Sequence, residues 1–167
     1  GGNDGVVFES TDNCALKNCT VRNVSGIGVR AKKTTNTAID NCSINNVGLQ
    51  GIVIQNGGAY KTLTSSGNVI ENCDIYTVGR TAPVGGVGIM ISYETGTKVL
   101  NNRVHDTPHD AIRLSRGTAC TVEGNEVYNA VNDTYDAGAI YTGASMFEGV
   151  GNIFKNNYIH DIYRTSD

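Results

Sequence analysis

The segment Ile39-Asp40-Asn41-Cys42-Ser43-Ile44 carries a pattern that recurs six times along the chain. An apolar residue is followed by two residues, then Cys or Asn, one further residue and a second apolar residue. The central residues of the six copies are Cys19, Cys42, Cys73, Asn102, Asn125 and Asn157. They are separated by 23, 31, 29, 23 and 32 residues. A minimum step of 23 residues with some longer steps predicts a fixed coil that carries loop insertions.

A second element lies between successive copies of the pattern. It is a short strand that opens with a small residue and continues with apolar, often β-branched residues, which favour strands. Its members are Gly5-Val6-Val7-Phe8, Gly26-Ile27-Gly28-Val29, Gly51-Ile52-Val53-Ile54, Gly88-Ile89-Met90-Ile91, Ala111-Ile112-Arg113-Leu114 and Ala139-Ile140-Tyr141-Thr142. A repeat of two or three such strands has no room for a helix or a propeller blade. The sequence therefore predicts an all-β fold, a right-handed parallel β-helix that forms a single-stranded solenoid of about six coils.

The Cys/Asn column predicts what lies inside the coils. Equivalent residues of stacked coils lie above one another at about 4.8 Å, so the three asparagines are expected to form an inward ladder of amide hydrogen bonds. The three cysteines are expected to continue that column as small, reduced core residues, because parallel Cβ vectors do not suit a disulfide. The aliphatic residues that flank the column are expected to fill the core; they include Ile39, Ile44, Ile52 and Ile54.

Composition excludes several classes of protein. The 167 residues include 21 Gly and 19 Asn but no Trp. The net charge is −3, and the sequence has no basic stripe that would bind nucleic acid. No apolar run approaches the roughly 18 residues of a membrane span. Residues 1–167 are expected to form a single β-helix domain, a piece of a longer solenoid with no visible signal peptide. Open coil ends expose unpaired backbone groups, which leaves end-to-end self-association open.

Two phrases in the later repeats resemble a known family. Asn102-Arg103-Val104-His105-Asp106 and Asn157-Tyr158-Ile159-His160-Asp161 share the order Asn, any residue, apolar, His, Asp. This order is similar to that of bacterial β-helix repeat proteins of the pectate-lyase-like superfamily, and the resemblance covers nearly the whole chain. The segment from Asp136 to Gly143 is similar to a subset of secreted carbohydrate-active enzymes. The resemblance implies an extracellular bacterial protein whose partner is a polysaccharide or oligosaccharide.

The resemblance also implies a binding groove along one face of the solenoid. Here that face is expected to consist of the strands that open with Gly or Ala. The residues expected to point outward from it are Gly28, Val53, Met90, Arg113 and Tyr141.

Polar residues gather in the loops that lead into the last two of these strands. Asp110 and Asp136 precede them on adjacent coils, which predicts a carboxylate separation of roughly 5–10 Å, as glycoside hydrolysis requires. We expect these two residues to be catalytic, with His109 relaying a proton. The residues expected to bind the sugar are Arg113, Tyr141, His105 and Asp133.

Other interpretations of the same residues stay open. Asp before a strand often caps a turn, and Arg113 could simply pair with Asp110 or Asp136. A polysaccharide lyase of the same fold needs a base and a group that neutralises the substrate carboxylate, and the loop from Asp133 to Asp136 leaves room for Ca²⁺. No metal site is otherwise expected. A non-catalytic solenoid that binds carbohydrate or serves as an adhesive or structural segment is the third possibility.

Overall fold

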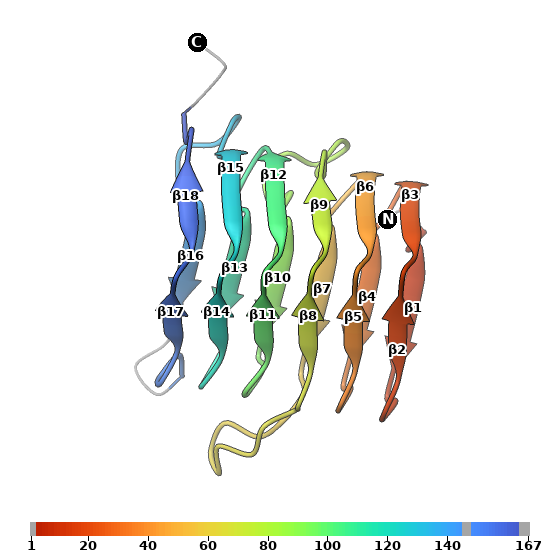
Figure 1. The fold of residues 1–167 in the computed structure, drawn as a ribbon, viewed down its shortest axis with the longest axis vertical. Coiled ribbons are helices and arrows are strands. Elements are labelled where there is room, and N and C mark those ends of the chain that lie inside the picture. Colours follow the sequence, from red (N-terminus) through yellow and green to blue (C-terminus); the bar gives the residue numbers. More distant parts are fainter. Residues whose placement is uncertain (1–2, 145–147, 164–167) are drawn as a thin grey trace.

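The computed structural model describes residues 3–144 and 148–163, and its strands form three parallel sheets of six strands each (Figure 1). The first sheet contains β1 (Val6–Glu9), β4 (Val29–Lys32), β7 (Ile52–Gln55), β10 (Ile89–Ser92), β13 (Ile112–Ser115) and β16 (Ile140–Gly143). The second contains β2 (Ala15–Lys17), β5 (Ala38–Asp40), β8 (Val69–Glu71), β11 (Lys98–Leu100), β14 (Thr121–Glu123) and β17 (Ile153–Lys155). The third contains β3 (Thr20–Val24), β6 (Ser43–Val47), β9 (Asp74–Tyr76), β12 (Arg103–Thr107), β15 (Glu126–Ala130) and β18 (Tyr158–His160).

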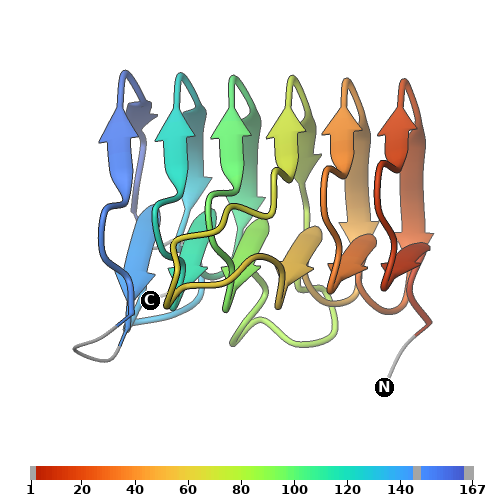
Figure 2. The same ribbon diagram turned by 90° about the horizontal axis from the view of Figure 1, so that it is seen from below.

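Each coil of the chain contributes one strand to each sheet, and every neighbouring pair of strands is parallel. The six coils lie in a row from the first to the last, and loops leave the row only at the turns (Figure 2). The expected right-handed parallel β-helix of six coils is confirmed. The described residues contain no helix long and apolar enough to cross a membrane.

The Cys/Asn column stacks in one line, as predicted. Asn102 N and Nδ2 both donate to Asn125 Oδ1, at 2.9 and 3.0 Å, and Asn125 N and Nδ2 donate to Asn157 Oδ1 in the same way. Cys73 N donates to Asn102 Oδ1 at 3.0 Å, and Cys42 N donates to Cys73 Sγ at 3.4 Å. The column therefore joins all the later coils through side chains as well as through the sheets.

The core consists of aliphatic columns beside this ladder. Ile39, Ile44, Ile52 and Ile54 are all fully buried, as expected. A column of small residues stands at the entry to the first sheet, where a Cβ on Gly51 would lie 2.5 Å from the carbonyl oxygen of Gly88. Non-bonded heavy atoms do not approach one another to 2.5 Å, so this position has room only for the hydrogen atom of a glycine.

Asparagine has a second use at the turns. Eleven asparagines adopt a positive φ, between 45° and 63°, a conformation that Asn tolerates better than most residues. They are Asn13, Asn18, Asn23, Asn36, Asn41, Asn46, Asn56, Asn72, Asn101, Asn129 and Asn156. The high Asn content therefore reflects tight turns as much as the inward ladder.

All five cysteines are free thiols, as predicted for the three of the Cys/Asn column, but their burial differs. Cys42, Cys73 and Cys120 are buried, whereas Cys14 and Cys19 on the first coil are half-buried. Burial raises the pKa of the Cys73 thiol to about 12 and that of Cys120 to about 11. The thiolate is the reactive form of cysteine. The buried thiols are therefore protected from modification both by their burial and by their low thiolate fraction.

We expect iodoacetamide to label only Cys14 and Cys19 readily in the folded chain at pH 7.5. Because a rise in pKa from 9.0 to about 12 lowers the thiolate fraction about 1000-fold, Cys73 is expected to react only after unfolding in urea. Mass spectrometry of the labelled peptides measures this, with the urea-unfolded chain as the control. Rapid labelling of Cys73 without urea would contradict the stacked core.

Candidate functional site

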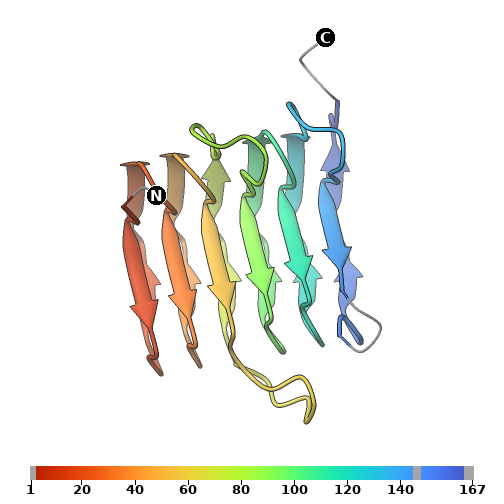
Figure 3. The same ribbon diagram turned by 180° about the vertical axis from the view of Figure 1, so that it is seen from behind.

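The outer face of the first sheet is the predicted groove face, and Figure 3 shows its strands in front. Strand register places six residues in one outward column: Val7, Arg30, Val53, Met90, Arg113 and Tyr141. The outward positions expected for the last four of these are confirmed.

The expected outward position of Gly28 is wrong, and Arg30 occupies that place. Val29 pairs with Ile52, so Gly28, and not Gly26, is the counterpart of Gly51. A Cβ on Gly28 would lie 2.5 Å from Ile44 Cγ2, which shows that this position faces the core. Two glycines that each precede an apolar residue made the register ambiguous in the sequence, and the close approach between coils selects the second.

A hollow of about 240 Å³ lies in the middle of this face. Val53 and Met90 form part of its lining, and polar side chains line the rest together with Ile27: Gln50, Gln55, Ser92 and Ser115. Gln50 Nε2 donates to the carbonyl oxygen of Gly85 at 2.9 Å, which holds one wall in place. Apolar surface combined with a few placed polar groups is typical of ligand sites.

Asp110 lies just before β13, at the edge of this face, and is fully buried. Its Oδ2 lies 3.1 Å from His109 Nδ1 and 3.1 Å from Arg113 Nη1. Neither contact has hydrogen-bond geometry, so both Asp110 Oδ2 and His109 Nδ1 remain without a hydrogen-bond partner. Asp110 Oδ1 accepts a hydrogen bond from Gly138 N at 2.8 Å. A buried carboxylate with a cation on one oxygen and a backbone N–H on the other is electrostatically compensated.

His109, Asp110 and Arg113 form a cluster, the Asp110 cluster, and Arg113 connects it to the outer face. Its guanidinium carbon lies 4.6 Å from the centroid of the Tyr141 ring on the next coil, a cation–π contact. The Arg113 side chain is 27% exposed, whereas that of His109 is 8% exposed. Of the three residues of the cluster, Arg113 therefore offers the most surface to a ligand.

The structure brings the loop of Asp136 close to Asp110, but it gives the two residues different environments. Asp136 is exposed, whereas Asp110 has no exposed surface. The bond from Gly138 to Asp110 shows that this loop packs against the cluster. Catalysis by the pair Asp110 and Asp136 remains a prediction.

Asp133 and His105 lie apart from Arg113 and Tyr141. Asp133 is exposed and lines a separate hollow of about 260 Å³, together with Arg80 and Asp106, among the loops that follow the third sheet. His105 lies on the outer face of the third sheet, in β12. Binding of the sugar by these two residues also remains a prediction.

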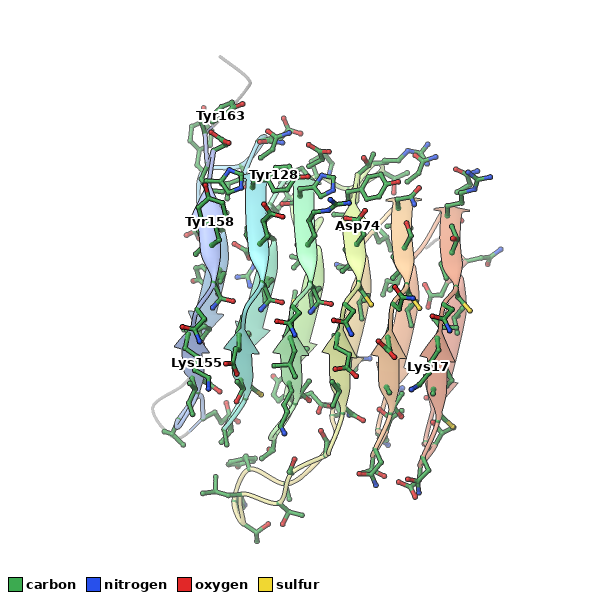
Figure 4. The ribbon with its side chains drawn as sticks, in the orientation of Figure 1. Lys17, Asp74, Tyr128, Lys155, Tyr158 and Tyr163 are labelled. Atoms are coloured by element: carbon green, nitrogen blue, oxygen red, sulfur yellow. The ribbon has the colours of Figure 1, made fainter. Side chains whose placement is uncertain are left out.

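His105 belongs to a stack of rings that the sequence interpretation missed. Its ring lies between those of Tyr76 and Tyr128, at centroid distances of 4.9 and 4.6 Å, and Tyr128 in turn stacks on His160 at 5.1 Å. The four residues occupy the third position after the Cys/Asn column in successive coils, and this spacing is visible in the sequence. Asp74 and Tyr128 lie on this face, as Figure 4 shows.

Ion pairs accompany this stack. Asp74 accepts hydrogen bonds from Arg103 Nε and Nη2 at 2.9 and 2.8 Å, and its Oδ1 lies 3.3 Å from His105 Nε2. The Arg103 guanidinium lowers the pKa of Asp74. Asp74, Arg103 and His105 thus repeat, on the far side of the solenoid, the residue types found in the Asp110 cluster.

Within residues 3–144 and 148–163, no group of three or more His, Cys, Asp or Glu side chains is arranged to hold a metal ion. Calcium binding by the loop from Asp133 to Asp136 remains a prediction.

The fold, the stacked columns and the predicted groove face together define a solenoid of the β-helix type. The chain belongs to the family described as "Right handed beta helix region", whose model matches residues 4–166. A search of curated proteins finds no match.

The solved structures that are similar to the chain include two epimerases. A mutant of the periplasmic alginate epimerase AlgG superposes with a TM-score of 0.59 at 16% identity, over 93% of this chain and 43% of that protein. The A-module of the Azotobacter vinelandii mannuronan C-5 epimerase AlgE6 superposes with a TM-score of 0.58 at 14% identity, over 96% of this chain and 55% of that one. The chain thus spans about half the length of these proteins, and at such identities the likeness concerns the fold.

Proposed function

We propose that the chain binds an acidic polysaccharide across the outer face of the first sheet and acts on it with His109, Asp110 and Arg113. The observation that carries this proposal is the position of Arg113, which lies between the buried Asp110 carboxylate and the Tyr141 ring. A guanidinium held in this way is suited to pair with a carboxylate of a uronate sugar. The similar solved structures are enzymes of alginate or mannuronan, and a secreted or periplasmic location fits this role.

We favour proton abstraction over hydrolysis, because Asp110 has no exposed surface, whereas the side chains of Arg113 and His109 are 27% and 8% exposed. In a uronate unit the carbon-bound proton next to the carboxylate can be removed by a base once a cation neutralises that carboxylate. Here Arg113 would supply the cation, and His109 would accept the proton, because imidazole can act as a base near neutral pH. Asp110 would hold both groups in place. Return of a solvent proton to the opposite face of that carbon gives epimerisation. Elimination follows if the electron pair instead forms a carbon–carbon double bond and expels the neighbouring glycosidic oxygen, which takes up a proton.

Hydrolysis by Asp110 and Asp136 is the second candidate. It is supported by the contact between the Asp136 loop and Asp110 through Gly138. It requires a movement that exposes Asp110, because a general acid must reach the glycosidic oxygen.

Product analysis on mannuronan, polygalacturonate and xylan in deuterated buffer separates these reactions. Deuterium incorporation without chain cleavage indicates epimerisation, unsaturated ends indicate elimination, and saturated reducing ends indicate hydrolysis. Binding without any of these products would identify a non-catalytic solenoid and would overturn the reaction part of the proposal.

We expect Arg113→Ala to lower the rate of product formation on the acidic substrates by about 10- to 100-fold. A hydrogen bond to a charged group contributes about 1.5–3 kcal/mol, and each 1.4 kcal/mol corresponds to a factor of ten. The matched control is Arg103→Ala, which removes a paired arginine from the third sheet and is expected to change the rate less than about twofold. Equal effects of the two substitutions would contradict the assignment of the groove.

A further inference from the structure

The loop between β7 and β8 forms an ordered hairpin beside the groove. Ala59 and Thr64 exchange backbone hydrogen bonds of 2.8 and 3.0 Å, so the tip carries Tyr60 and Lys61. This loop produces the first of the longer repeat steps, and it extends past its own coil toward the later coils (Figure 2). A hairpin that crosses its neighbours can form a wall together with them.

The base of the hairpin is fixed by the adjacent coil. Thr95 N donates to the carbonyl oxygen of Gly57 at 3.1 Å, and Ser66 N donates to that of Thr95 at 2.7 Å. The side chain of Glu94 is buried and accepts a hydrogen bond from Gly57 N. Burial raises the pKa of Glu94. These bonds hold the hairpin in one position, so a site that it forms needs no ordering on binding.

A pocket of about 290 Å³ lies between the hairpin and the later coils. Tyr60 and Tyr93 line it from two sides, and they are 42% and 51% exposed. Arg116 lies over the Tyr93 ring at 4.8 Å and donates to its hydroxyl group. Arg116 Nε also lies 3.4 Å from Glu148 Oε2. Two exposed rings and fixed charged groups therefore converge on one cavity.

We propose that this pocket is a second carbohydrate site that holds a single acidic sugar unit. Exposed tyrosine rings offer flat apolar faces and hydroxyl groups, which suit the faces and edges of a sugar ring. The pocket contains two cations and one carboxylate. Arg116 is paired with Glu148. Lys61 Nζ lies 6.0 Å from the centroid of the Tyr60 ring and has no ion pair among the described residues, so its ammonium group favours a ligand carboxylate.

The position of the pocket relates it to the groove. Ser92 and Ser115 line the central hollow of the outer face, and the residues that follow them in the chain, Tyr93 and Arg116, line the pocket. The two cavities thus lie side by side at the edge of the first sheet. The pocket can hold a sugar unit next to a chain that occupies the groove, and its binding does not depend on any reaction at Asp110.

Titration of the full ¹⁵N-labelled chain with sodium glucuronate tests the proposal. The amide signals of Gly58 and Thr95 are expected to shift on binding, and glucose at the same concentrations is expected to cause much smaller shifts. Lys61→Ala and Tyr60→Ala are each expected to weaken glucuronate binding about two- to fivefold, the effect of one exposed ion pair or ring contact. Lys98→Ala, which removes an exposed lysine from β11, is the matched control and is expected to leave the binding unchanged.

The Arg113→Ala variant separates this site from the groove, since it is expected to retain the shifts at Gly58 and Thr95. Shifts confined to Val53 and Met90 would overturn the proposal, as would equal binding by the Lys61→Ala and Lys98→Ala variants. Absence of any shift at Gly58 and Thr95 at the highest glucuronate concentration would overturn it as well. A chain without catalytic activity would still show this binding.

Discussion

Replacing Asn125 by alanine is expected to lower the free energy of unfolding by about 3–5 kcal/mol. Its side chain is buried, accepts two hydrogen bonds from Asn102 and donates at 3.0 Å to the carbonyl oxygen of Val99. Alanine leaves these groups buried without partners, and each such group costs about 1–3 kcal/mol. Urea unfolding followed by far-ultraviolet circular dichroism measures the change.

The chain itself offers the control for this substitution. Cys73 fills the same column, where its Sγ accepts from Cys42 N and lies 3.1 Å from the carbonyl oxygen of Glu71. Asn125→Cys is therefore expected to cost only about half as much as Asn125→Ala. Asn45→Ala removes an amide from the outer face of β6 and is expected to cost less than about 1 kcal/mol. A ladder role for Asn125 is refuted if Asn125→Ala costs no more than Asn45→Ala.

The column that opens the sequence pattern also explains why the fold was predictable. A residue in a parallel coil stack has the same neighbours in every coil, so one physical requirement recurs at a fixed position in the sequence. The change from Cys73 to Asn102 keeps that requirement, a small side chain that accepts from a backbone N–H. The strand register at Gly28 was not determined in this way, since Gly26 satisfies the same pattern.

The sites follow from the sequence only in part. Asp110 was identified because it precedes a repeated strand, but its burial depends on His109, Arg113 and the loop of Gly138, which no repeat specifies. The ring stack that contains His105 does follow the repeat, three residues after the column. The pocket at Tyr60 cannot be predicted from the repeat. A hairpin that reaches across coils forms it from residues that have no common position in the repeat.

We expect Asp110→Asn to lower kcat on the acidic polysaccharide by about 100-fold or more while leaving KM within a few-fold. Asn keeps the size of the side chain and can still accept from Gly138, but it removes the negative charge that faces Arg113 and His109. Loss of a charge that holds catalytic groups costs several kcal/mol in the transition state, and each 1.4 kcal/mol is a factor of ten. Steady-state kinetics on the full chain measures both constants, and the thermal midpoint reports whether the variant is folded.

Two further substitutions show which role Asp110 has. Asp74→Asn breaks the equivalent contacts to Arg103 and His105 on the third sheet and is expected to change kcat less than about threefold, because that cluster lies away from the groove. Asp136→Asn distinguishes the reactions. It is expected to keep most of the activity if Asp110 positions Arg113 and His109 for proton abstraction, whereas hydrolysis by two carboxylates would lose as much rate with Asp136→Asn as with Asp110→Asn. Full kcat in the Asp110→Asn variant would contradict both mechanisms, because proton abstraction depends on the negative charge of Asp110 and hydrolysis depends on a carboxyl group that can donate a proton.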